Sequence, residues 1–160
     1  MEVIEYEDKY LENVKDLLVE LEEYLVSIDY DELEIVHSDF REEYVKYDFD
    51  LINKQEGKCY LAIDKGSVVG LIMGYLRKYD DIDRLDYKCP KEGVVSELIV
   101  SKNVRSKGIG RELMAKMEDY FRSKSCEYIV IEVFGYNDPA LKFYYKQGYH
   151  VRGVNTIKKL

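Results

Sequence analysis

The fold is decided by residues 94–121, which read VVSELIVSKNVRSKGIGRELMAKMEDYF. The mostly apolar run from Val94 to Val100 predicts a central strand. After a polar turn, apolar side chains recur at helical spacing and predict one buried helix face, made of Ile109, Leu113, Met114, Met117, Tyr120 and Phe121. The stretch therefore predicts a strand that leads through a glycine-containing turn into a helix.

The turn between this strand and this helix has the composition of an anion-binding site. Gly108 and Gly110 open the helix, and four basic residues lie in or beside the turn, namely Lys102, Arg105, Lys107 and Arg111. Glycine lets the backbone approach a diphosphate closely, and the unpaired amides and the dipole of a helix start favour its negative charge. A tight turn with solvated basic side chains would have the same composition, so the pattern alone leaves both interpretations open.

Two other phosphate-binding motifs fit this sequence poorly. It has no Gly-x-x-x-x-Gly-Lys-Ser/Thr loop, and Leu113 stands where a dinucleotide fingerprint would need its third glycine. A nucleotide-binding protein that uses the Gly108 turn remains an alternative, and it predicts that ATP or NAD binds in preference to coenzyme A.

The residues before this stretch predict two helices and three strands. We expect a strand at 3–6, a helix with its apolar face within 14–25 and a second helix over 40–51. The second helix would be capped by Ser38 or Asp39, with Glu42 completing the capping box. A β-hairpin follows, formed by the strands 59–63 and 68–76.

The residues after this stretch predict the remaining elements of the fold. We expect a buried strand at 128–133, a helix that starts at Asn137 and ends at Gly148, and one or two closing strands over 149–160. The complete order predicts an α/β fold with a mixed, mostly antiparallel central sheet flanked by helices.

Two patterns in the C-terminal half belong together. The first is Arg105-x-x-Gly108-x-Gly110, and the second is Asn137-x-x-Ala140-x-x-Phe143-Tyr144-x-x-x-Gly148-Tyr149. They resemble motif A and motif B of the GNAT superfamily of acetyl-CoA-dependent N-acetyltransferases. The resemblance is specific over residues 94–149 and topological before them. It implies that residues 1–160 form a single domain with the GNAT-like acyl-CoA N-acyltransferase fold.

The resemblance implies acetyl-CoA as the co-substrate. The amides of residues 105–110 would hold the coenzyme diphosphate, with charge added by Arg105 and Lys107, and Leu98 and Val100 would offer backbone groups to the pantetheine arm. In this family the motif A strand separates from the next strand, and that gap would admit the thioester. The full implied set is Leu98, Ile99, Val100, Arg105, Ser106, Lys107, Gly108, Ile109, Gly110, Arg111, Asn137 and Tyr144. No metal is implied.

Acetyl transfer to a primary amine needs a neutral amine, a donor for the oxyanion and a proton for the departing thiolate. Tyr144 matches the family's position for the general acid, and a phenol of pKa about 10 can protonate a thiolate whose conjugate acid has a pKa of about 8.5. Glu97 and Glu132 are the two candidates for the general base, and a mechanism in which solvent takes the proton stays open. A non-catalytic acyl-CoA-binding regulatory module, in which Tyr144 only packs on the coenzyme, is the alternative from a different class.

Charge is unevenly distributed along the chain, whose net charge is −8. Residues 1–60 contain 19 acidic and 6 basic residues, a balance of −13, whereas residues 61–160 contain 13 and 18, a balance of +5. The net charge argues against a nucleic-acid partner held by phosphate contacts. The acidic segment 24–34, with Asp80, Asp81 and Asp83, would attract a cationic acceptor such as a polyamine, an aminoglycoside or a lysine side chain. A solvated surface would have the same composition.

Composition also predicts the location of the protein. No apolar run approaches the roughly 20 residues of a membrane-spanning helix, and the acidic first residues lack the pattern of a signal peptide. We therefore expect a soluble protein without a membrane partner. Cys59, Cys89 and Cys126 are odd in number and widely spaced, which favours neither disulfides nor a zinc site and fits a reducing cytoplasm. The resemblance also allows a homodimer that pairs through the last strands.

Overall fold

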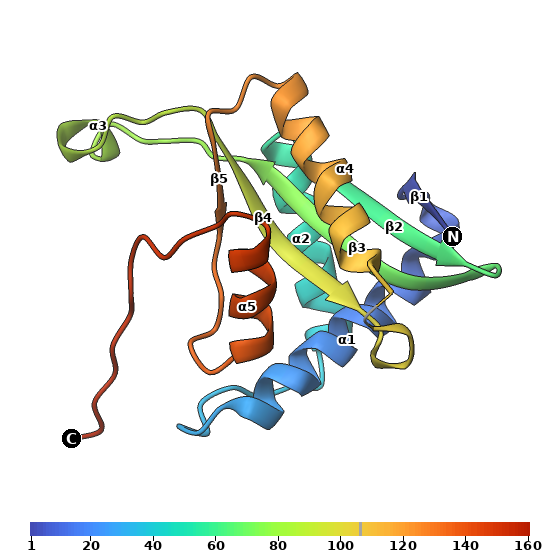
Figure 1. Cartoon of the computed structure of the whole chain (residues 1–160). Coiled ribbons are helices and arrows are strands. Elements are labelled where there is room, and N and C mark those ends of the chain that lie inside the picture. The colour runs from blue at the N-terminus through green and yellow to red at the C-terminus, as the bar shows by residue number, and fades with distance from the viewer. Residues whose placement is uncertain (106) are drawn as a thin grey trace.

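A five-stranded sheet runs through the centre of the protein (Figure 1). The computed structural model describes residues 1–105 and 107–160, and within them the strands are β1 (Glu2–Glu5), β2 (Lys58–Asp64), β3 (Ser67–Leu76), β4 (Glu92–Val100) and β5 (Tyr128–Ile131). They lie in the order β1-β2-β3-β4-β5. Every neighbouring pair is antiparallel except β4 and β5, which are parallel. The predicted mixed, mostly antiparallel sheet is confirmed.

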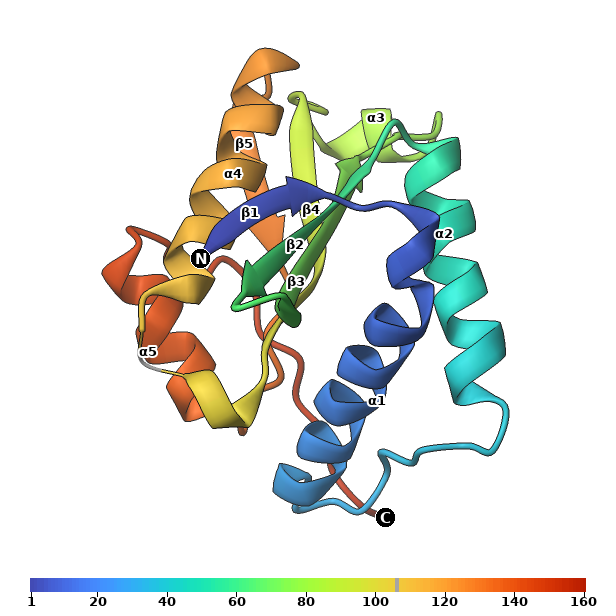
Figure 2. The ribbon, with the colours of Figure 1, turned by 90° about the vertical axis from the view of Figure 1, so that its right-hand side faces the viewer.

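Helices cover both faces of this sheet (Figure 2). One face carries α1 (Leu11–Ile28) and α2 (Val45–Lys54), and the other carries α4 (Ile109–Ser123) and α5 (Asp138–Lys146). A single turn, α3 (Asp83–Asp86), projects from the sheet within the long loop between β3 and β4 (Figure 1). Shorter turns lie at Asp8–Tyr10, Phe40–Tyr44 and Lys102–Val104. The predicted α/β arrangement of helix, sheet and helix layers is thus present.

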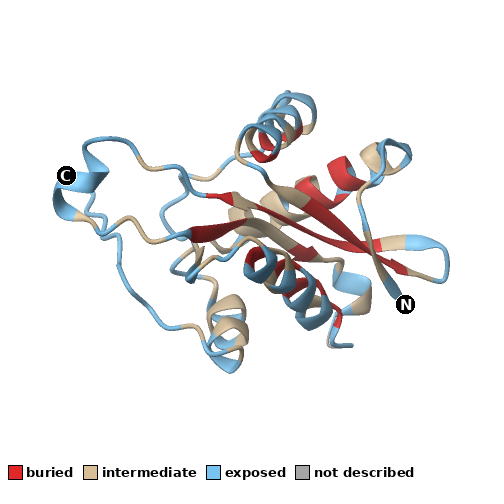
Figure 3. Cartoon of the chain, turned by 90° about the horizontal axis from the view of Figure 1, so that it is seen from above, coloured by how far each residue is buried: buried red, intermediate tan, exposed pale blue. Residues whose placement is uncertain are grey.

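Two buried apolar clusters hold these layers together. One lies between the sheet and α1 and α2 and includes Val14, Leu18 and Met73; the other lies between the sheet and α4 and includes Leu113 and Met117. Each such buried side chain contributes roughly 1.5–3 kcal/mol. The middle strands are buried on both faces (Figure 3), which is why their sequences are continuously apolar rather than alternating.

Gly93 shows how closely α4 approaches β4. A Cβ atom at this position would lie 2.4 Å from the ring of Phe121, far inside van der Waals contact. Only glycine therefore lets the end of α4 pack directly onto the start of the central strand, and this contact fixes the helix over the strand that carries Glu97.

Two local predictions are wrong. Residues 149–160 form no strand; nearly all of this segment is exposed, and it extends away from the body of the protein (Figure 1). Its exposed apolar side chains recur every third residue, so a strand would have no single apolar face to bury. The expected capping box is also not formed, because the Glu42 carboxylate accepts hydrogen bonds from Lys15 Nζ at 2.7 and 2.9 Å.

The strands β4 and β5 separate halfway along β4. Residues 92–95 pair with residues 128–131, whereas residues 96–100 pair with no described residue of β5. At the same place the pairing of β4 with β3 is irregular, because Met73 is opposite Glu97 while Gly74 is opposite Val95. Ser96 is the extra residue of this bulge. The bulge and the separation together leave a gap in the sheet beside Glu97.

Candidate active site

Glu97 lies where β4 leaves β5. Its register partner Met73 belongs to the apolar cluster beneath α1 and α2, so the Glu97 side chain points to that face of the sheet. The hydroxyl of Tyr44 donates a hydrogen bond to Glu97 Oε1 at 3.1 Å. Burial and the nearby charge of Asp48 raise the pKa of Glu97 to about 8, against the lowering effect of the Tyr44 hydrogen bond. A carboxyl group with this pKa is suited to take a proton near neutral pH.

Asp48 is a second buried carboxyl group that our sequence analysis missed. It lies on the buried face of α2, between Val45 and Ile52, and is 2% exposed. Its Oδ2 atom has no hydrogen-bond partner among the described residues. Burial raises the pKa of Asp48 to about 7. The signal in the sequence was its spacing: Asp48 comes three residues after Val45 and four before Ile52, which places it on the apolar face of the helix.

Tyr144 faces the same gap from α5. Its ring packs against the rings of Phe143 and Tyr149, with centroid distances of 5.2 and 5.8 Å. Burial, with a smaller effect from the charge of Glu97, raises the pKa of Tyr144 to about 12. The phenol is therefore protonated at neutral pH, as a proton donor must be. The next residue, Tyr145, is exposed and points elsewhere.

Glu132 occupies a different environment from Glu97. It follows the last residue of β5 directly and is exposed. Burial raises the pKa of Tyr75 on β3, with smaller raising effects from the charges of Glu132 and Asp48, so both carboxylates lie around this phenol. The structure thus places Glu97 half-buried beneath α1 and α2 and Glu132 exposed just beyond the end of β5.

The predicted diphosphate turn precedes α4. Gly108 is the N-cap residue with a φ of 83°, a left-handed conformation that favours glycine, and no described side chain caps the helix. A Cβ atom on Gly110 would lie 3.4 Å from Phe143 Cζ and 3.7 Å from Val100 Cγ2, so this residue stands where α4, α5 and β4 meet. Lys107 and Arg111 are exposed beside the turn, while Ser106 lies outside the described residues.

Arg105 makes contacts that the motif did not predict. Its Nε donates to the carbonyl oxygen of Val100 at 3.0 Å, and its guanidinium lies 5.3 Å from the ring centre of Tyr24. The side chain thereby links the end of β4 to α1. In this conformation its charge is directed at the base of the turn and at an aromatic ring.

The remaining predicted coenzyme residues divide between the two faces of the sheet. Ile99 packs into the cluster beneath α1 and α2, whereas Leu98, Val100 and Ile109 pack on the α4 side. Asn137 is the N-cap of α5, and its Oδ1 accepts hydrogen bonds from the Ala140 amide at 3.3 Å and from the Tyr24 hydroxyl at 3.2 Å. The predicted cap is present. Both hydrogen bonds use the oxygen of the Asn137 amide, so its NH₂ group is available to donate to a ligand.

The two acidic regions that we expected to attract an acceptor lie apart. The segment after α1 approaches the loop before α5, where the Tyr136 hydroxyl donates to Asp31 Oδ2 at 2.7 Å. Asp80 and Asp83 instead form a local turn at α3, which projects from the other end of the sheet (Figures 1 and 2). Only the first region therefore lies near the gap.

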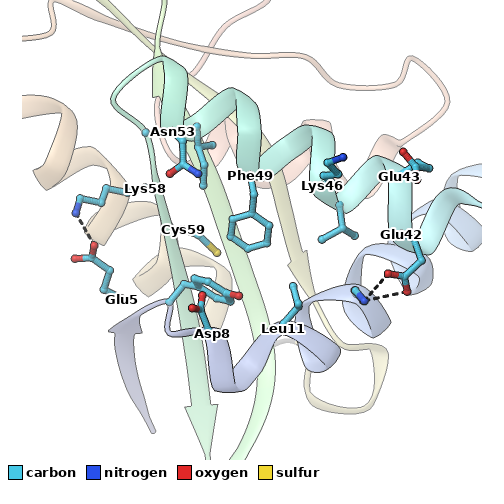
Figure 4. A pocket seen from close by; sticks show the side chains of 15 residues that line it. Glu5, Asp8, Leu11, Glu42, Glu43, Lys46, Phe49, Asn53, Lys58 and Cys59 are labelled. Carbon is cyan, nitrogen blue, oxygen red and sulfur yellow. Dashed lines mark hydrogen bonds and ion pairs between the residues drawn. The ribbon is translucent and has the colours of Figure 1, made fainter.

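A pocket of about 670 Å³ lies between α2, the start of α1 and the strands β1 and β2 (Figure 4). Its floor is apolar and includes Phe49 and Cys59, and its rim carries the ion pairs Lys15–Glu42 and Lys58–Glu5. None of the residues predicted for coenzyme or catalysis lines it. This pocket is therefore separate from the gap beside Glu97.

The described part of the chain lacks two further features. No group of three or more His, Cys, Asp and Glu side chains is placed there to hold a metal ion. None of its helices has both the length and the apolar character needed to cross a membrane.

Comparison with known proteins identifies relatives in sequence and in fold. A family model described as "Acetyltransferase (GNAT) family" matches residues 18–149. A Methanocaldococcus jannaschii protein named as an uncharacterized N-acetyltransferase is 37% identical over 94 residues, which are 58% of this chain and 53% of that protein. The chain thus spans about half the length of this curated relative.

Solved structures share the fold across nearly the whole chain. A mutant of a Bacillus halodurans protein superposes with a TM-score of 0.85 at 19% identity, covering 100% of this chain and 99% of that one. An aminoglycoside acetyltransferase from an uncultured soil metagenomic sample, in complex with sisomicin, superposes with a TM-score of 0.68 at 17% identity, covering 99% and 95%. At these identities the likeness concerns the fold.

Proposed function

This chain belongs to the GNAT family of acetyltransferases, and we propose that it transfers the acetyl group of acetyl-CoA to a cationic primary amine by direct attack in a ternary complex. The observation that carries the proposal is the gap between β4 and β5, which has Glu97 and Tyr144 at its sides and the uncapped start of α4 at its end. A base, an acid and an anion-binding turn are the three groups that the transfer needs.

The coenzyme half of the reaction uses mainly backbone groups. The first amides of α4 and the left-handed turn at Gly108 bind the diphosphate, and the unpaired edge of β4 binds the pantetheine arm as a further strand would. Lys107 and Arg111 add positive charge at the exposed side of the turn. The thioester then enters the gap beside Glu97.

The proton transfers use Glu97 and Tyr144. Of the two candidate bases we propose Glu97, because its raised pKa of about 8 is closer to that of an alkylammonium than the pKa of an ordinary carboxyl group is. Tyr144 donates its hydroxyl proton to the departing thiolate.

The charge of the acceptor half supports a cationic amine. Residues 1–60 carry an excess of 13 negative charges, and the part of them that follows α1 lies near the gap. The partners that we propose are acetyl-CoA and this amine, in a cytoplasmic setting and with no role for nucleic acid, membrane or metal. A homodimer stays a prediction.

The test is a screen for release of free thiol from acetyl-CoA in the presence of polyamines, aminoglycosides, lysine peptides and neutral amines. We expect turnover with at least one cationic amine and none in the absence of amine. A protein that binds acetyl-CoA but releases no thiol with any amine would be a regulatory acyl-CoA-binding module, and the proposal would be wrong.

A further inference from the structure

Asp48 and Glu97 lie on the same face of the sheet, beneath α1 and α2, because Val45 and Ile52, which flank Asp48 on α2, share one apolar cluster with Met73, the register partner of Glu97. Asp48 is 2% exposed, and its Oδ2 has no hydrogen-bond partner within the described residues. The Tyr44 hydroxyl binds one oxygen of Glu97. No described lysine or arginine acts on the ionisation of either carboxyl group, whereas the charge of Asp48 raises the pKa of Glu97. The buried Asp48 and the half-buried Glu97 thus have no counter-ion among the described residues.

Such an arrangement is costly unless a ligand completes it. A carboxylate moved out of water loses several kcal/mol of hydration that only a cation or several hydrogen bonds restore. Here α2 holds Asp48 between the apolar residues Val45 and Ile52, where an apolar or amide side chain would pack at less cost. The free oxygen of a carboxyl group buried to this degree is a site for a small cation that bears hydrogen-bond donors.

We propose that Asp48 is the specificity-determining residue for the acceptor and binds its ammonium group together with Glu97, which selects unbranched primary alkylammonium ions. This inference rests on the proposed function and adds to it the residue that recognises the acceptor. A primary ammonium has three N–H donors, which suffice for Asp48 Oδ2, one oxygen of Glu97 and one further acceptor.

The surrounding aromatic residues define the shape of this acceptor. The rings of Phe40 and Tyr44 stack with centroids 4.5 Å apart, and the ring of Tyr47 lies 6.4 Å from that of Tyr44. Tyr75 of β3 is affected by the charge of Asp48, and Tyr144 of α5 by the charge of Glu97. Rings of this kind pack along an alkyl chain and attract a cation at its end. Between these rings only an unbranched alkyl chain is narrow enough to bring its ammonium group to Asp48.

The chemistry balances with these groups. The ionised Glu97 takes one proton from the bound ammonium, and the neutral nitrogen then attacks the thioester carbonyl carbon. The carbon–sulfur bond breaks, Tyr144 donates its hydroxyl proton to the departing thiolate, and the second proton lost by the nitrogen returns to the Tyr144 phenolate. Asp48 is ionised above its raised pKa of about 7, and in that form it holds the charge of the acceptor before the proton leaves.

The titration of Glu97 is a readout of Asp48, because the negative charge of Asp48 raises the pKa of Glu97. The titratable groups that face the pair come from five elements and the turn before α2, namely Glu22 of α1, Tyr44 of the turn, Cys59 of β2, Tyr75 of β3, Tyr144 of α5 and, at the rim, Glu132 after β5. Arg77, which follows β3, lowers the pKa of Tyr75 but acts on neither carboxyl group, so removal of the Asp48 charge moves the pKa of Glu97 downward.

The test compares wild type, Asp48→Asn and Asp50→Asn with 1,5-diaminopentane and with aniline, which is uncharged at neutral pH. Asp50→Asn is the matched control, since it removes the same charge from the exposed side of the same helix. In Asp48→Asn we expect the KM for 1,5-diaminopentane to rise about 10- to 100-fold, because the ammonium loses a hydrogen bond to a buried charge. The KM for aniline and the affinity for coenzyme A should stay unchanged. The acidic limb of the pH profile moves to lower pH. Asp50→Asn behaves as wild type.

Each contrary outcome has its own meaning. A wild type that releases no thiol with any amine would overturn the proposed function. A wild type that acetylates other amines but not 1,5-diaminopentane would overturn only this inference. The same holds if a folded Asp48→Asn, with normal coenzyme affinity, keeps both the KM for 1,5-diaminopentane and the pH profile of wild type.

Discussion

The helices α4 and α2 pack on opposite faces of the sheet and bring opposite chemistry to it. The start of α4 presents backbone amides beside Gly108, with no described side chain to cap them. The buried face of α2 presents Asp48, a carboxyl group with a free oxygen. The first feature is made by neighbouring residues in the sequence, whereas the second exists only because α2 packs on the sheet. The comparison teaches why the coenzyme side of the gap is easier to infer from sequence than the acceptor side.

The largest effect is expected at the point where the two sides meet. Tyr144→Phe removes the phenol hydroxyl and retains the ring that packs against Phe143 and Tyr149. We expect the single-turnover rate of acetyl transfer to fall by about 10²- to 10⁴-fold, with acetyl-CoA affinity nearly unchanged. Tyr145→Phe, on the exposed neighbour, is the control. A full rate in Tyr144→Phe would show that the ring only packs; a loss of coenzyme affinity would assign it a structural role.

A substitution at Gly110 tests the α4 side alone. Gly110→Asp places a carboxylate in the first helical turn, where it favours the helix but repels a diphosphate. We expect coenzyme A affinity to fall by about 100-fold in a folded protein, as measured by calorimetry. Gly110→Ala is the matched control, because its Cβ would meet Phe143 and Val100 at ordinary contact distances of 3.4 and 3.7 Å. Unchanged affinity in Gly110→Asp would remove the diphosphate site from this turn.

Stability against pH tests the α2 side alone. The pKa of Asp48 is raised from 3.8 to about 7 in the folded protein, so the folded state binds more protons than the unfolded state between these values. The free energy of unfolding therefore falls as pH rises from about 4 to about 7, and this difference in pKa corresponds to about 4 kcal/mol. Asp48→Asn should flatten the dependence and raise stability at pH 8. Urea unfolding at several pH values measures this dependence. If the free energy of unfolding changes with pH equally in wild type and Asp48→Asn, the pKa of Asp48 is not raised in the folded protein.

Salt should have the smallest effect, and it acts on the acceptor side through exposed charges. Long-range attraction between the acidic segment after α1 and a cationic amine is largely screened beyond about 8 Å at physiological ionic strength. We expect the KM for a cationic amine to rise about 3-fold between low and physiological salt, and the KM for aniline to stay unchanged. A best substrate of net negative charge, or a KM that is indifferent to salt, would contradict this account of the acidic half.

Most of the fold, including the turn before α4 where we predict the coenzyme diphosphate to bind, could be predicted from the sequence, because its signals are local. The apolar run of β4, the glycines before α4 and the cap at Asn137 each lie within a few residues of the structure they form. The closing strands were predicted from composition alone, and no partner strand supports them. Arg105 could not be placed, because its contact with Tyr24 joins residues that are distant in the sequence.

The acceptor side could not be predicted in the same way. Glu97 and Glu132 both lie among mostly apolar residues in predicted strands, and only the separation of β4 from β5 leaves one half-buried and the other exposed. Asp48 is remote from every motif in the sequence, and its burial depends on the packing of α2. For such residues, the pattern of apolar neighbours was the sole sequence signal.

The most direct test of the central claim, that Glu97 in the gap is the base for acetyl transfer, is the pH dependence of the single-turnover rate in wild type and Glu97→Gln. The pKa of Glu97 is raised to about 8, so the ionised base forms as pH rises through this value. The account predicts a wild-type rate that rises with pH up to about 8 and then levels, and a Glu97→Gln rate that is lower by about 10²- to 10⁴-fold and lacks this rise. A Glu97→Gln protein with the rate and the pH profile of wild type would contradict it.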